Sequence, residues 1–167
     1  MPGIDACLEE AMSLPGARGA AIVDWTSGLA LGTAGASPGG DHEATAAETA
    51  DLARAAAEYT AFAPDAEPVT ESGTGTGTGT GTEPRTDPRS SDRRRSDSGR
   101  PDSGRSDKGP PVEDLIVTTR TGYHLLCFVE TTFDSSVFLH LWLDRTTGNL
   151  ALARLRLRQL AERLVLG

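Results

Sequence analysis

The sequence predicts an α+β fold, in which a five-stranded antiparallel sheet carries helices on its faces. Stretches with helix-like apolar spacing and short strand-like apolar runs occur in the order α-β-β-α-(insert)-β-β-β-α. Neighbouring strand-like runs are separated by short turns, as in β-hairpins, and hairpins build antiparallel sheets. A long low-complexity segment separates the second helix from the third strand, and it sets the domain organisation.

The first half of this pattern begins with a helix over residues 4–14, where apolar residues recur every four positions. Pro15 and Gly16 end this helix, because neither residue favours its continuation. Strands at 19–25 and 29–35 then form the first hairpin, joined by a short turn.

The second helix begins at Asp41, whose side chain is suited to cap the first helical turn. Apolar spacing extends the helix to about Phe62, and alanine dominates its remaining positions. An alanine-rich helix lets a neighbouring helix approach closely, because no long side chain holds the neighbour away. The stripe that such a neighbour would contact consists of Leu52, Ala55, Tyr59 and Phe62.

The second half of the domain contains strands at 113–119, 123–130 and 137–144 and a last helix at 149–166. The strand at 137–144 is apolar at nearly every position, which is typical of a central strand covered on both faces. The first two of these strands form a second hairpin, and together with the first hairpin the five strands complete the sheet.

Residues 64–111 lie between the two halves and contain almost no apolar side chains. A Gly-Thr repeat is followed by an arginine- and serine-rich stretch in which RRRS (93–96) resembles a kinase substrate motif. This segment buries too little apolar surface to offset the entropy of ordering, so we expect disorder. The Gly-Thr run lacks the Lys-Ser/Thr pair and following helix of a phosphate-binding loop, which favours a flexible linker. Residues 1–63 and 112–167 are expected to form one domain.

The charge balance favours a protein partner over a nucleic acid. The chain has 16 basic and 24 acidic side chains, a net charge of −8. Residues 83–108 carry eight of the basic and six of the acidic residues, so the remainder is strongly acidic and repels phosphates. No apolar run approaches the length of a membrane span, and the acidic start does not resemble a secretory signal. Cys7 and Cys127 lie far apart, as expected of reduced thiols in a cytoplasmic protein.

The residues that could carry chemistry do not form a recognisable constellation. His124 and Cys127 are three apart on one predicted strand, so their side chains should point to opposite faces. His140 lies on a neighbouring strand, where it could approach either His124 or Cys127, but no third group is evident to orient a catalytic dyad. The scattered histidines and cysteines lack metal-ligand spacing. We therefore expect no catalytic residues, no cofactor and no metal.

The first hairpin and its flanking helix carry a resemblance to a known family. The stretch LEEAMSLPGARGAAIVDWTSGLALGTAG (8–35) resembles the opening of the Roadblock/LC7 family, whose sheet is profilin-like. The helix at 41–62, the segment EDLIVTTRTGYHLLCFVE, the strand VFLHLWLD and the last helix are similar to the rest of that family. The long insert is a departure, because this family normally has a short connection there.

The resemblance implies a non-enzymatic regulator that forms dimers and binds a small Ras-like GTPase. In bacteria, similar proteins accompany a small GTPase and a sensor kinase in signalling. The resemblance implies a homodimer seam formed by the strand at 114–119 and the second helix. The residues expected in this seam are Leu52, Ala55, Tyr59, Phe62, Leu115 and Val117.

The alternative is a small-molecule-sensing or scaffold module on a profilin-like sheet. It would need a cavity lined around Trp25, Phe128 and Trp142. A small molecule that raises the melting temperature would favour sensing, whereas a dimer that binds a GTPase would favour the regulator.

Overall fold

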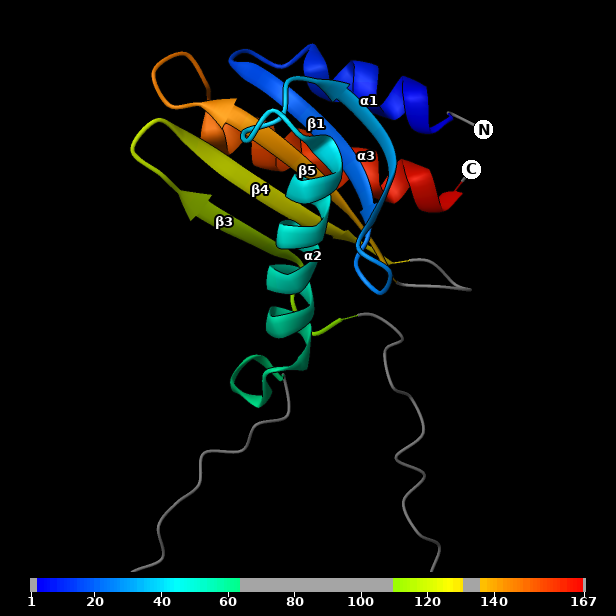
Figure 1. Cartoon of the computed structure of the whole chain (residues 1–167). Helices are drawn as coiled ribbons and strands as arrows, with labels where there is room; N and C mark the ends of the chain where they lie inside the picture. The colour runs from blue at the N-terminus through cyan, green and yellow to red at the C-terminus, as the bar shows by residue number, and fades with distance from the viewer. Residues whose placement is uncertain (1–2, 64–109, 131–135, 167) are drawn as a thin grey trace, which may run out of the picture. The chain divides into compact units, whose positions relative to one another are not determined.

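The computed structural model describes residues 3–63, 110–130 and 136–166 (Figure 1). The predicted disordered insert therefore lies outside the described residues, apart from its last two positions. The elements in chain order are α1 (Ile4–Met12), β1 (Ala17–Asp24), β2 (Leu29–Gly35), α2 (His42–Glu58), η1 (Thr60–Phe62), β3 (Asp114–Thr118), β4 (Gly122–Val129), β5 (Val137–Asp144) and α3 (Leu150–Leu166).

The five strands form one sheet in the order β2-β1-β5-β4-β3, and every neighbouring pair is antiparallel. This confirms the predicted fold class. The strand β5 lies at the centre, and four of its side chains are at most 1% exposed, as its apolar sequence predicts. The edges of the sheet are β2 and β3.

Helices cover both faces of the sheet. The helices α1 and α3 lie on one face and α2 crosses the other (Figure 1). Side chains alternate along each strand, so that Leu125 and Cys127 enter the core under α1 and α3, while Leu126 and Phe128 enter the core under α2. Two apolar layers therefore hold the sheet from opposite sides.

The α2 helix contacts the sheet through alanine alone. Its buried residues are Ala46, Ala50, Ala53 and Ala56. Asp41 caps its first turn as predicted, because its carboxylate accepts hydrogen bonds from the backbone N–H groups of Glu43 (2.9 Å) and Ala44 (3.3 Å).

The predicted end of α2 near Phe62 is wrong. The helix ends at Glu58, Tyr59 is extended with a ψ of 123°, and the 3-10 helix η1 follows. The end of α2 and η1 extend past the strands of the sheet (Figure 1), so their side chains gain little from packing. Tyr, Thr and Phe are weaker helix formers than alanine, and Pro64 disfavours helical geometry in the residue before it.

A close backbone contact fixes the start of the first hairpin. A Cβ atom at Gly19 would lie 1.8 Å from the carbonyl oxygen of Ala36, so only glycine fits there. The backbone N–H of Ala36 donates to the Arg18 carbonyl at 2.8 Å, and this bond holds the end of β2 against the start of β1. Among the described residues, no helix has the length and apolar character that crossing a bilayer requires.

Candidate interaction surface

Exposed apolar side chains gather at the end of α2 and on η1. Leu52, Tyr59 and Phe62 are 43%, 59% and 50% exposed, and the rings of the last two lie 6.4 Å apart. Ala55, on the same stripe, is half-buried. Clustered apolar exposure of this kind marks interaction sites more often than isolated exposed residues do.

The strand β3 provides the second part of this surface, because it is an edge strand with no neighbour among the described strands on its outer side. Val117 is 38% exposed, whereas Leu115 is half-buried against the core under α2. Ile116, on the opposite face of β3, is 39% exposed. Sequence reasoning missed Ile116, although a strand that is apolar on both faces and lies at an edge is a recognisable signal.

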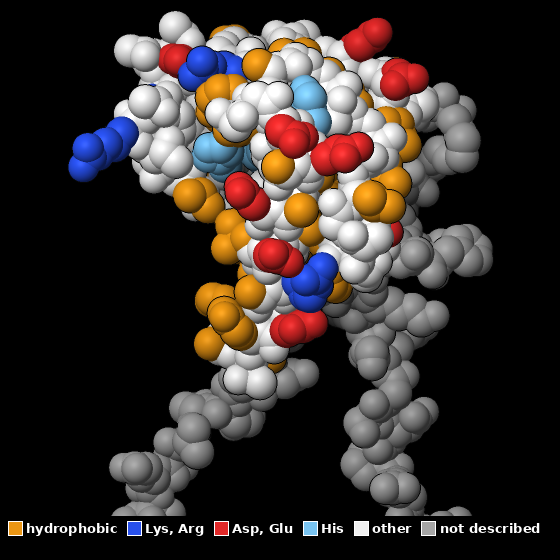
Figure 2. Space-filling view, viewed as in Figure 1, with side chains coloured by type: hydrophobic (Ala, Val, Ile, Leu, Met, Phe, Trp, Pro, Cys, Tyr) orange, Lys and Arg blue, Asp and Glu red, His pale blue; other side chains and the backbone are white. Residues whose placement is uncertain are grey.

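We call Leu52, Tyr59, Phe62, Ile116 and Val117 the apolar surface. Acidic side chains accompany its helical part. The exposed face of α2 carries Glu43, Glu48, Asp51 and Glu58. The single basic residue of α2, Arg54, donates to the Asp51 carboxylate at 2.9 Å and to the Trp25 carbonyl at 2.7 Å. Figure 2 shows red side chains interleaved with orange along this helix.

A row of stacked rings lies on the sheet face beside β3. His124, the cross-strand partner of Val117, lies next to His140 with 3.1 Å between Nδ1 and Nε2. The His124 ring stacks on His140 at 5.4 Å and on Trp142 at 6.3 Å between centroids, and the Arg18 guanidinium lies 4.1 Å above Trp142.

Burial lowers the pKa of both histidines in this row. His140 is only 4% exposed, and burial together with His124 lowers the pKa of its imidazole to about 4. The pKa of His124 is also lowered by burial. Both rings are therefore neutral near pH 7. The sequence left open whether His140 approaches His124 or Cys127, and strand order and register decide for His124.

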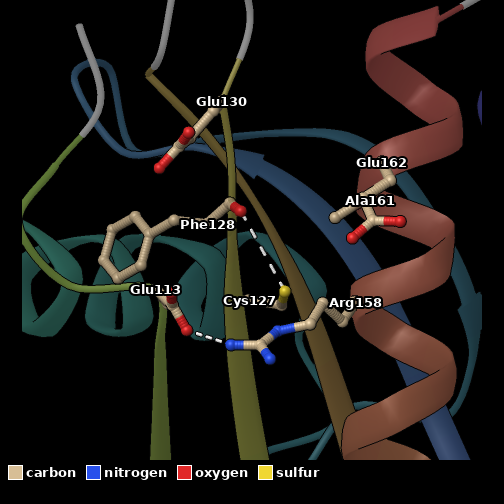
Figure 3. Close-up of a pocket in the computed structure, with 7 residues that line it drawn as sticks. All are labelled: Glu113, Cys127, Phe128, Glu130, Arg158, Ala161 and Glu162. Carbon is tan, nitrogen blue, oxygen red and sulfur yellow. Dashed lines mark hydrogen bonds and ion pairs between the residues drawn. The ribbon is translucent and has the colours of Figure 1, made fainter. Parts of the chain in front are cut away.

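Cys127 lies on the opposite face from His124, as predicted, and reaches a cavity of about 590 Å³ between β4 and α3 (Figure 3). Glu113 and Arg158 form an ion pair across this cavity. Burial raises the pKa of the Cys127 thiol to about 11. The thiol is therefore protonated near pH 7, and a protonated thiol is a poor nucleophile.

The three aromatic residues of the alternative hypothesis do not converge. Phe128 and Trp25 belong to the core under α2, whereas Trp142 lies between Arg18 and His124. Neither Trp25 nor Trp142 lines the cavity in Figure 3, whose charged lining residues are three glutamates and Arg158. Among the described residues, no group of three or more histidine, cysteine or acidic side chains could hold a metal ion.

A five-stranded antiparallel sheet with one long helix on one face, two helices on the other and β3 at an open edge defines a Roadblock/LC7-type fold. Comparison of the sequence with protein-family models gives no match, and comparison with curated proteins gives none. Solved structures do match. Myxococcus xanthus MglB superposes with a TM-score of 0.60 at 15% identity, covering 97% of this chain and 84% of that chain.

Two further structures agree. MglB with a tetrameric arrangement gives a TM-score of 0.58 at 17% identity, covering 97% of this chain and 85% of that one. A Roadblock/LC7 domain from Streptomyces avermitilis gives a TM-score of 0.52 at 13% identity, covering 96% of this chain and 92% of that chain. Identities this low show a shared fold, and they confirm that this chain has the Roadblock/LC7-type fold.

Proposed function

We propose that the protein is a cytoplasmic, non-enzymatic adaptor that forms a homodimer and regulates a small Ras-like GTPase in bacterial signalling, together with a sensor kinase. The observation that carries the proposal is the apolar surface, whose residues lie on an open edge strand and on an exposed helix end of a Roadblock/LC7-type fold. The Roadblock/LC7 resemblance of the sequence supplies the class of partner.

The homodimer would form by pairing β3 with β3 of a second copy. An edge strand offers a row of backbone N–H and C=O groups, and a second copy satisfies them by extending the sheet. A two-fold axis through this pairing would bring α2 of each copy to the same side of the joined sheet. The seam would then bury the exposed side chains of Leu52, Tyr59, Phe62 and Val117, together with the half-buried Leu115 and Ala55.

The GTPase would contact the outer part of α2. Glu43, Glu48, Asp51 and Glu58 are exposed there, so the complementary partner surface carries basic residues. Charge complementarity of this kind mainly accelerates association and excludes acidic partners.

The dimer is tested by size-exclusion chromatography with light scattering. We expect the wild-type chain to have twice the monomer mass at micromolar concentration, and Val117→Asp to be monomeric, because a charge at the seam would be buried without a partner. Leu31→Asp is the matched control, since Leu31 is 49% exposed on β2, at the opposite edge of the sheet from the proposed seam. A wild-type monomer at these concentrations contradicts the proposed dimer.

The GTPase partnership is tested by pull-down with the small Ras-like GTPase encoded nearest to this protein, loaded with GDP or with a non-hydrolysable GTP analogue. We expect binding that depends on the nucleotide and that falls at least tenfold, as an order-of-magnitude estimate, with Glu48→Arg, which reverses a charge on the exposed face of α2. Glu9→Arg, which makes the same change on α1 at the other face of the sheet, should bind as the wild type does. Equal absence of binding in both nucleotide states contradicts this part of the proposal without affecting the dimer.

A further inference from the structure

The arginines of the described domain differ in the partners that their side chains contact. Removing the eight basic residues of 83–108 from the total of 16 leaves eight, and all of these are arginines in described residues. Four form ion pairs with carboxylates: Arg54 with Asp51, Arg154 with Asp114, Arg158 with Glu113, and Arg163 with Glu10. Arg156 donates to the Gln159 side chain at 3.2 Å. The other three are Arg18, Arg120 and Arg145.

These three arginines line one cavity. It measures about 600 Å³ and lies where β1 begins, where the β3–β4 turn passes and where β5 leads into α3. The full lining is Arg18, Arg120, Thr121, Asp144, Arg145 and Thr146.

Neutral groups hold two of the arginines in place. The Arg18 guanidinium rests on the Trp142 ring, 4.1 Å from its centroid. Arg145 donates from Nη1 to the Thr119 carbonyl at 2.9 Å, and its backbone N–H donates to the Thr121 carbonyl at 3.1 Å. Among the described residues, no carboxylate forms an ion pair with either guanidinium, and the fold already meets much of the entropic cost of ordering both.

The one acidic residue in the cavity wall is occupied by its own turn. The Asp144 carboxylate accepts hydrogen bonds from the N–H groups of Thr146 (2.8 Å) and Thr147 (3.0 Å). These bonds lower the pKa of Asp144 to about 2, so it stays ionised. Three guanidinium groups and one carboxylate leave the lining with a charge of +2.

We propose that this cavity binds a phosphate group, either in a free phosphate compound or in a phospholipid headgroup. A planar guanidinium can donate two parallel hydrogen bonds to phosphate oxygens, and three arginine side chains line this cavity. A phosphate dianion also balances the charge of the lining. The remainder of the domain is acidic, which would keep a phosphate from binding elsewhere on it.

The test is calorimetric titration of the full chain with inorganic pyrophosphate, at constant ionic strength maintained with sodium chloride. We expect saturable binding with one site per chain. Arg120→Gln should weaken it about tenfold, because one charge-assisted hydrogen bond is lost. Arg120 lies exposed in a turn, so the variant should unfold at the wild-type temperature. Arg145→Gln should weaken binding at least as much.

Arg156→Gln is the matched control, since it removes the same charge from an arginine outside the cavity. Vesicles of phosphatidylcholine with and without phosphatidic acid form a second arm. Pyrophosphate binding that Arg120→Gln weakens supports a free phosphate compound. Binding seen only to phosphatidic acid vesicles, and weakened by the same variant, supports a lipid headgroup. An equal effect of Arg156→Gln, or no saturable binding in either arm, overturns the proposal.

Discussion

Acidification from about pH 7 to about pH 4.5 should destabilise this protein through the buried His124–His140 pair. His140 is 4% exposed between Ala21 of β1 and Leu126 of β4, and the nearest titratable group is His124, 3.1 Å away. Among the described residues, no carboxylate is hydrogen-bonded to either ring. A proton added to His140 in the folded state therefore meets burial and no compensating charge.

The magnitude follows from the pKa of His140, which is lowered from 6.5 to about 4. Because its pKa is lowered, His140 prefers the neutral form in the folded state. The contribution of this group to the free energy of unfolding is therefore fully present above pH 6.5. It is lost as the pH falls from 6.5 to about 4, because the unfolded chain binds the proton first. At about 1.4 kcal/mol per pH unit, the loss is on the order of 3 kcal/mol, a large part of a typical domain's stability. The lowered pKa of His124 acts in the same direction.

The stabilisation contributed by Asp144 is lost at a lower pH than the stabilisation contributed by His140. The pKa of Asp144 is lowered from 3.8 to about 2, so its stabilisation is lost only below pH 3.8. The assay is urea unfolding at a series of pH values, with the unfolding free energy extrapolated to water at each. His140→Gln should lose most of the slope between about pH 6.5 and 4.5. His42→Gln, at the start of α2 and outside the pair, should keep the wild-type slope. If the unfolding free energy of His140→Gln decreases on acidification as steeply as that of the wild type, the reasoning is refuted.

Three further predictions concern stability. Burial raises the pKa of Cys127 from 9.0 to about 11, so its stabilisation holds below pH 9.0 and is lost as the pH rises toward 11. We expect the unfolding free energy measured with urea to fall by on the order of 3 kcal/mol over this range. If the unfolding free energy of Cys127→Ala falls as steeply with rising pH as that of the wild type, this prediction is contradicted. Gly19→Ala should cost at least about 2 kcal/mol in thermal unfolding, whereas Gly39→Ala, where a Cβ meets nothing within 4 Å, should cost less than about 0.5. Asp41→Ala should remove the α2 cap at a cost of about 1 kcal/mol, and an unchanged melting temperature would count against that role.

The order of elements could be read from the sequence because local signals agree with the fold. The bounds of β2 and β5 match the predicted 29–35 and 137–144, since turn residues border both runs. The end of α2 could not be read in the same way. The spacing of Tyr59 and Phe62 fits a helix, but nothing in the sequence reveals that the sheet ends before these residues do.

The sites depended on register and on strand order, which the sequence does not display. His124 and His140 become neighbours only because β4 pairs with β5, with Leu126 opposite His140. Arg18, Arg120 and Arg145 are separated by most of the chain, and only the folded sheet brings them to one cavity. The assignment of residues to the dimer seam depends on the family resemblance, and their role in a dimer stays a prediction.

The alanine contact of α2 has a consequence for how the domain opens. Its four buried side chains are single methyl groups, so this helix contributes far less apolar burial than the leucines of α3 and β5. Local opening that lifts α2 from the sheet should therefore cost much less than global unfolding. Backbone amides of α2 would then exchange with solvent deuterium before those of β5. A partner that covers the outer face of α2 would slow this exchange, and binding would be coupled to the ordering of the helix itself.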